Sequence, residues 1–206
     1  MRIETAADLR GRFEGQLVLV EPLGPQHADG LLAAAGEENV FQWLPEDLGS
    51  SPEQTERWLA TAVAAGEAGR EVPFAILAEG RVVGSTRFLE IRPEHLRAEV
   101  GWTWLAPSVW GRGVNVETKL LLLTQAFESA GCRRVEFKTD ARNARSRGAL
   151  EALGATFEGI FRKHMVVQRG EPRDSAYYSV IDDEWPEVMA LLERRLEHHL
   201  EAERTR

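Results

Sequence analysis

The chain has 206 residues, of which 43% are hydrophobic and 28% charged, close to an average soluble protein and unlike a disordered or membrane protein. At this length we expect one domain over 1–206 with a sizeable core. The net charge of −8 opposes general binding to nucleic acid or to an anionic membrane, and it favours a cationic or amine-bearing partner.

Two features indicate the compartment. Residues 1–8 carry acids where a signal peptide needs an apolar core, and no later run approaches the roughly 18 apolar residues of a membrane span. The single cysteine, Cys132, cannot form an internal disulfide, which agrees with a reducing environment. We therefore expect a cytoplasmic protein in which Cys132 is a small buried hydrophobe.

The first half of the chain predicts strands and helices behind a poorly fixed lead-in over 1–14. The pattern predicts a strand over 16–21, helices over 26–35 and 52–68, a loop over 37–51, and strands over 72–78 and 81–91. Ser51 and Pro52 suit the start of the second helix. Glu79-Gly80 joins the two strands as a hairpin turn.

In the second half, strands alternate with helices. Strands are predicted over 98–105, 133–139, 156–168 and 174–181, and helices over 116–130, 143–154 and 184–206. This order predicts an α/β (α+β) fold, a mixed sheet of about seven strands with helices on both faces.

A glycine turn lies between the strand 98–105 and the helix 116–130. Its residues are Trp110, Gly111, Arg112, Gly113, Val114 and Asn115. A strand that leads through such a turn into a helix presents several backbone N–H groups at the positive end of the helix dipole, which suits a pyrophosphate. A plain structural turn is the alternative.

Four motifs in this order carry a family resemblance. They are Val100-Gly-Trp-Thr-Trp-Leu-Ala-Pro107, Trp110-Gly-Arg-Gly113 with Glu117 and an apolar helix, Arg142-Asn-Ala-Arg-Ser146 with Ala149 to Ala155, and Tyr178 to Trp185. Over 14–187 the chain resembles the GNAT superfamily of N-acetyltransferases, in particular its RimJ/RimL-like branch. In the family's cofactor loop, Trp110 and Asn115 depart from the usual residues and Gly113 is kept.

The resemblance implies that acetyl-CoA lies between two splayed strands, 99–105 and 133–139. It places the acyl group at the main chain of Thr103, Trp104 and Leu105, the side chain of Asn143 at the pantetheine arm, and Ser146 near the thioester sulfur. A hydroxyl there can donate a proton to the leaving thiolate. Alternatively, Asn143 caps a helix and Ser146 completes its first turn.

The resemblance also indicates a general base and an acid. Glu99 precedes Gly113 by the same distance as the catalytic glutamate of the histone-acetylating members precedes their loop glycine. The alternative is an exposed carboxylate paired with Arg97 or Arg87, and His164 is a second candidate base. The tyrosine that many members use as the acid is missing near positions 157 and 161, which favours Ser146.

Several further residues have expected roles. Glu117 is expected to brace the glycine turn, and Arg112, Arg145 and Arg147 are candidates to contact the CoA phosphates. The histidines have no ligand-like spacing with acids or Cys132, so no metal site is predicted.

The acceptor remains open. The resemblance implies the N-terminal amine of a ribosomal or other protein, or a small molecule such as an antibiotic, an amino acid or a polyamine. A CoA-binding module without catalysis is a rival from another class. Loops 38–51 and 91–96 are expected to select the acceptor. Trp43, Trp102 and Trp104 are candidates to line an acceptor groove, and core packing is the alternative expected for two of them. A homodimer through Leu192, Leu196 and Leu200 is one alternative, and packing of these leucines on their own sheet is the other.

Overall fold

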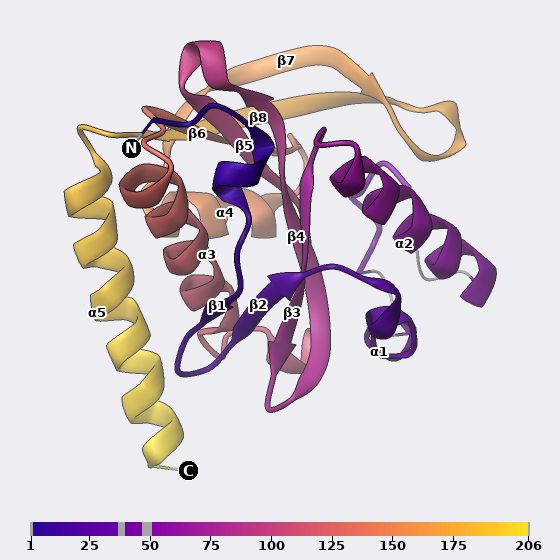
Figure 1. Cartoon of the computed structure of the whole chain (residues 1–206), viewed down its shortest axis with the longest axis horizontal. Coiled ribbons are helices and arrows are strands. Elements are labelled where there is room, and N and C mark those ends of the chain that lie inside the picture. Colours follow the sequence, from indigo (N-terminus) through magenta and orange to yellow (C-terminus); the bar gives the residue numbers. More distant parts are fainter. Residues whose placement is uncertain (1, 37–39, 47–50, 206) are drawn as a thin grey trace.

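A twisted sheet forms the centre of the computed structural model, which describes residues 2–36, 40–46 and 51–205. Within these residues eight strands follow the order β1-β2-β3-β4-β5-β6-β8-β7 (Figure 1). They are β1 (Phe13–Glu14), β2 (Leu19–Pro22), β3 (Val72–Ala78), β4 (Arg81–Arg92), β5 (Arg97–Leu105), β6 (Arg134–Asp140), β7 (Thr156–Val166) and β8 (Pro172–Ile181). Strands β5 and β6 are parallel and the other neighbours are antiparallel. The predicted mixed sheet is confirmed, with β1 as an additional short strand.

Five α-helices accompany the sheet in the described residues, and two of them have side-chain caps. They are α1 (Ala28–Ala35), α2 (Pro52–Glu67), α3 (Val114–Thr124), α4 (Ala144–Leu153) and α5 (Trp185–Arg204), with a π-helical turn at Gln125–Ser129. Short 3-10 turns lie at Ala6–Leu9, Pro25–His27, Pro93–His95, Pro107–Val109 and Gln168–Gly170. The Ser51 side chain accepts the N–H of Gln54 and so caps α2, and Gly154 ends α4 with a φ of 97°.

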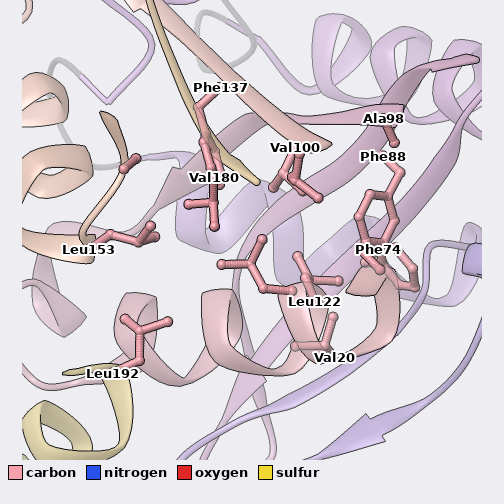
Figure 2. Close-up of a cluster of buried hydrophobic side chains, with 14 of the residues drawn as sticks. Val20, Phe74, Phe88, Ala98, Val100, Leu122, Phe137, Leu153, Val180 and Leu192 are labelled. Carbon is pink, nitrogen blue, oxygen red and sulfur yellow. The ribbon is translucent and has the colours of Figure 1, made fainter. Parts of the chain in front are cut away.

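The helices cover the two faces of the sheet unequally. In Figure 1, α3 and α5 lie side by side on one face together with α4, and α1 and α2 lie on the other. The larger core fills the α3 side, where Phe88, Val100, Leu122 and Phe137 point toward one another from β4, β5, α3 and β6 (Figure 2). A smaller core lies beneath α1 and α2. Helices therefore cover both faces of the sheet, as predicted, although β7 is largely exposed.

The N-terminal segment differs from the expectation of a poorly fixed lead-in. Ile3 and Leu9 are 2% and 0% exposed and belong to the larger core. Thr5 and Asp8 form a reciprocal capping box around the first 3-10 turn. The segment is anchored because two apolar side chains reach a core that lies far away in sequence.

The C-terminal helix packs on its own sheet. Leu192 and Leu196 are buried in the larger core, and Leu200 packs partly buried against it. These leucines therefore do not form a free dimerisation surface. Cys132 is also buried, and burial raises the pKa of its thiol to about 12, as expected for a packing residue. No helix in the described residues is long and apolar enough to cross a membrane.

Candidate active site

The parallel strands β5 and β6 run together for a short distance and then separate. Their pairing joins Arg97, Ala98 and Glu99 to residues 134–136. From Val100 onward, β5 has no hydrogen-bonded ladder with β6. Its main-chain N–H and C=O groups on that side therefore face a gap between the two strands. Such groups need another partner, and an acyl group in the gap can supply one. The predicted splayed pair is confirmed.

A β-bulge interrupts β5 beside this gap. Thr86 of β4 lies opposite two residues of β5, Trp102 and Thr103, and Trp102 has the left-handed φ of 50°. Since side chains alternate along a strand, the extra residue reverses the alternation. Thr103 consequently faces α3, where it bonds to Lys119, whereas Glu99 faces the side of α1 and α2.

The glycine turn leads directly into α3. Gly113 has a φ of 81°, which favours glycine, and its C=O accepts the first α-helical bond from the N–H of Glu117 at 3.0 Å. The amides of residues 113–116 therefore lie at the free N-terminus of α3. A Cβ on Gly113 would lie 2.8 Å from Leu17 Cδ1, so the turn is tightly packed. This arrangement fits a diphosphate group.

Trp110 connects the two predicted cofactor motifs. Its indole Nε1 donates to the carbonyl oxygen of Leu105 at 2.8 Å, which ties the turn to the end of β5. The guanidinium of Arg145, in the first turn of α4, stacks 3.5 Å from the centroid of the Trp110 ring. The glycine turn and the start of α4 thus meet across the outer end of the gap.

The other two candidate phosphate-binding arginines have protein partners. Arg112 forms an ion pair with Glu79 at 3.5 Å. Arg147 donates from Nε to the hydroxyl of Tyr178 at 3.1 Å. Arg145 is therefore the arginine of the three that is best placed at the gap.

Asn143 and Ser146 form the start of α4, as predicted by the alternative in which Asn143 caps the helix. The Asn143 side-chain oxygen accepts the N–H of Ser146 at 3.0 Å. Ser146 is half-buried in the first turn. The amide nitrogen of Asn143 plays no part in this cap, so the capping role is compatible with a contact to pantetheine, which remains a prediction.

Glu99 is a buried carboxylate. It is 2% exposed, and its Oε2 lies 3.0 Å from Nζ of Lys138 on β6. The alternative of an exposed group paired with Arg97 or Arg87 is wrong, because those arginines pair with Glu136 and Glu71. The pairing follows from the parallel register, which sets β6 beside β5 at this point.

The surroundings of Glu99 favour its use as a base. Burial raises the pKa of Glu99, and the ammonium group of Lys138 opposes this rise. A Cβ at position 101 would lie 2.8 Å from Glu99 Oε1, so Gly101 leaves room for the carboxylate. A carboxylate with a raised pKa is a better proton acceptor than an exposed one.

His164 belongs to a hydrogen-bonded chain on β7 and β8. Its Nδ1 lies 3.1 Å from Ser175 Oγ, and its Nε2 lies 3.1 Å from the hydroxyl of Tyr177. Burial lowers the pKa of His164, and burial together with the charge of Glu99 raises the pKa of Tyr177 to about 12. Phe161 stacks on Tyr177 with 4.3 Å between centroids. Tyr177 of β8 thus lies beside Phe161 and His164 of β7.

The tryptophans divide between core and surface. Trp104 is buried in the smaller core. Trp102 is half-buried beneath the guanidinium of Arg87 at 4.6 Å, and Trp43 is half-buried beneath that of Arg142 at 5.3 Å. Trp43 and Trp102 therefore remain candidates for the acceptor side, and Trp104 does not. Of the predicted acceptor loops, 38–39 and 47–50 lie outside the described residues.

Glu117 has a structural role different from the expected one. Its carboxylate accepts the N–H groups of Gln16 and Leu17, each at 2.7 Å, and that of Val18 at 2.9 Å. The carboxylate thus fixes the turn between β1 and β2 to α3, and Glu117 bonds to the glycine turn only through its backbone N–H, which donates to Gly113 O. Residues 16–18 lie about one hundred residues away in sequence, beyond the reach of a local pattern.

Sequence analysis missed Lys119. This lysine of α3 is 4% exposed, and its Nζ donates to Thr103 Oγ1 at 2.8 Å. Burial lowers the pKa of Lys119 to about 7. Its position between the buried Thr118 and Leu122 was an available signal, because a lysine on a core-facing stretch of helix is uncommon.

The described residues contain no cluster of three or more potential ligands that could hold a metal ion.

Comparison with known proteins identifies the class to which this fold and site belong. Residues 17–156 match the family model described as the acetyltransferase (GNAT) domain. The chain therefore belongs to the GNAT family and is an N-acetyltransferase by class. A search of curated proteins gave no match.

Solved structures extend this assignment. A GCN5-related N-acetyltransferase from Brucella melitensis is 35% identical, with a TM-score of 0.84 over 91% of this chain and 86% of its own. A T. thermophilus protein that carries an acetyltransferase name is 40% identical, with a TM-score of 0.81 over 90% of this chain and 96% of its own.

Within the family, the predicted resemblance to the RimJ/RimL-like branch is confirmed at the level of the fold. Mycobacterium smegmatis RimJ, solved in complex with CoA-disulfide, is 22% identical, with a TM-score of 0.75 over 86% of this chain and 88% of its own. RimL is 20% identical, with a TM-score of 0.74 over 83% and 94%.

Proposed function

We propose that this enzyme moves an acetyl group from acetyl-CoA to a primary amine by direct attack in a ternary complex. The observation that carries the proposal is the buried Glu99 at the point where the pairing of β5 and β6 ends. The glycine turn fits a CoA diphosphate, since a Cβ on Gly111 would meet open space and the amides of residues 113–116 lie at the N-terminus of α3, where they have no acceptor within the helix.

The residues that would hold the cosubstrate line the gap. The amides of residues 110–115 would hold the diphosphate, Asn143 the pantetheine arm, and the main chain of residues 103–105 the acyl carbonyl. Acetyl-CoA supplies the activated acyl group. Main-chain N–H groups that are already directed into the gap would stabilise the oxyanion without reorganisation.

Glu99 would deprotonate the acceptor. An ammonium group must lose a proton before it can attack a thioester carbonyl, and the raised pKa of Glu99 suits that transfer, directly or through one water. Collapse of the tetrahedral intermediate then releases a thiolate, and Ser146 is the donor predicted for it. No covalent enzyme intermediate is needed.

Two observations bear on the acceptor class. RimL is a ribosomal alpha-N-protein acetyltransferase by name, which favours the N-terminal amine of a ribosomal or other protein here. The second candidate acceptors are antibiotics, amino acids and polyamines, and they are favoured by the half-buried Trp43 and Trp102, which suit a compact ligand. A CoA-binding sensor without catalysis is the remaining alternative. No nucleic-acid or membrane partner is proposed.

A thiol-release assay tests the proposal. The purified protein is mixed with acetyl-CoA and a panel of peptides and small amines. We expect acceptor-dependent release of CoA that falls at least about 100-fold in Glu99→Gln and persists in Glu193→Gln, a matched change on the exposed face of α5. Tight CoA binding with no acceptor-dependent release from any amine would instead support the sensor.

A further inference from the structure

Lys119 is a buried amine at the opening between the central strands. Its Nζ donates to Thr103 Oγ1 at 2.8 Å, and Thr103 Oγ1 lies 2.8 Å from Thr86 Oγ1. The Phe137 ring of β6 lies 6.0 Å from the ammonium nitrogen. Since Thr103 is on β5 and Phe137 on β6, Lys119 reaches from α3 to the point where the two strands part.

No carboxylate neutralises this lysine among the residues that the structure describes. Every nearby acid has another partner. Glu117 accepts the amides of residues 16–18, and Glu99 pairs with Lys138 on the opposite face of the sheet. On α5, Glu203 pairs with Arg112 and the ring of His199 packs against Gly113. A buried ammonium group without a counter-ion is unfavourable unless an anion arrives.

We propose that Lys119 is the proton donor to the sulfur that leaves the acyl-CoA. This inference rests on the proposed function, which places the acyl carbonyl at residues 103–105 and therefore the sulfur close to the Lys119–Thr103 pair. The anion that Lys119 lacks in the free enzyme is the thiolate that forms during the reaction. Lys119 replaces Ser146 in this role.

The step balances in atoms and charge. The C–S bond of the tetrahedral intermediate breaks, its electron pair goes to sulfur, and the carbonyl double bond forms again. The Lys119 ammonium gives one proton to the thiolate, which produces the free thiol of CoA and a neutral amine. The amine takes a proton from water before the next turnover.

The acidity of the two groups is well matched. Burial lowers the pKa of Lys119 to about 7, whereas a free thiol has a pKa of about 8.5. Proton transfer from nitrogen to sulfur is therefore favourable, and the donor regains its proton near neutral pH. A serine hydroxyl is a far weaker acid than an ammonium group with this pKa.

Kinetics provide the first test. The acid must be protonated, so the wild-type kcat should fall as pH rises through the pKa of Lys119. In Lys119→Met we expect kcat at pH 6.5 to fall about 100-fold or more and the alkaline limb to disappear. Lys163→Met, at an exposed position on β7, should retain the wild-type kcat at pH 6.5 and the alkaline limb. A lysine that only holds Thr103 would lower the rate and leave the limb in place, and that result would overturn the proposal.

Nuclear magnetic resonance gives a second test that does not require turnover. The chain has three lysines, Lys119, Lys138 and Lys163, so the Lys119 signal in labelled protein is assigned by elimination from Lys138→Met and Lys163→Met. The assignment does not require Lys119→Met, so it can be made even when that variant fails to fold. We expect CoA to shift the titration midpoint of Lys119 and desulfo-CoA, which lacks the thiol, to leave it unchanged.

The outcomes separate this inference from the proposed function. Equal shifts with CoA and desulfo-CoA, or no shift with either bound ligand, would overturn the role of Lys119 while leaving CoA binding intact. Acetylation of Lys119 by acetyl-CoA, detected by intact-mass spectrometry, would also overturn it, because the amine would then be a nucleophile. Failure of both ligands to bind would overturn the proposed function itself.

Discussion

Removal of the Lys138 ammonium should move the acid limb of the rate profile toward higher pH. Lys138 lies 3.0 Å from Glu99, and the two side chains are 16% and 3% exposed. Burial already raises the pKa of Glu99, and Lys138 is the main group that opposes the rise. An opposite charge at this distance lowers a carboxyl pKa by about 1 to 3 units. Lys138→Met should therefore raise the pKa of Glu99 further.

The assay is kcat/KM against pH for the wild type, Lys138→Met, Glu99→Gln and the double variant. Because Glu99 must be ionised to act as a base, kcat/KM below the limb should fall about 10- to 1,000-fold in Lys138→Met. The double variant should show no further loss relative to Glu99→Gln. An acid limb that stays in place in Lys138→Met would refute the assignment of Glu99 as the base.

The same substitution has a stability consequence with a defined sign. A carboxyl whose pKa is higher in the folded state contributes stability at low pH and loses it as pH rises through the folded pKa. The free energy of unfolding of Lys138→Met should therefore fall with rising pH over the range of its displaced limb. Urea titrations at several pH values measure this.

Three further changes have defined outcomes. Glu117→Ala leaves three amides unpaired, one buried and two partly buried, and should lower the free energy of unfolding in urea by about 3 kcal/mol; an effect below about 1 kcal/mol would mean that water replaces the carboxylate. Gly113→Ala combines a left-handed φ with a clash and should weaken CoA binding in calorimetry at least about tenfold, more than Gly111→Ala, which meets open space. Leu9→Ala should destabilise the fold by about 2 to 5 kcal/mol in urea, whereas a loosely held N-terminus would show almost no change.

Local chemistry explains which elements could be predicted. The helix α2 was predicted over 52–68 and spans Pro52–Glu67, because Ser51 and Pro52 carry their own starting signal. The hairpin turn at Glu79-Gly80 also forms as predicted, because its own two residues adopt the positive φ that such a turn requires. The cofactor turn also followed from local order, since a strand, a glycine and a helix start suffice to create it.

Long-range packing decided what the pattern could not show. The burial of Leu9 depends on a core supplied by distant elements, and the amides bound by Glu117 come from the far end of the chain. The partner of Glu99 depends on the parallel register of β5 and β6, which no local signal encodes. Lys119 was missed because a charged residue is ordinarily expected at the surface of a helix.

The additional residue in β5 has a mechanistic consequence. A regular strand would direct Glu99 and Thr103 to the same layer, since their numbers differ by four. Because of the bulge at Trp102, the proposed proton acceptor, Glu99, lies on one face of the strand. The proposed proton donor, Lys119, lies on the other face, where it bonds to Thr103. In the proposed reaction, protons therefore enter and leave on separate sides of one backbone. The acylated amine and the spent carrier can depart in different directions.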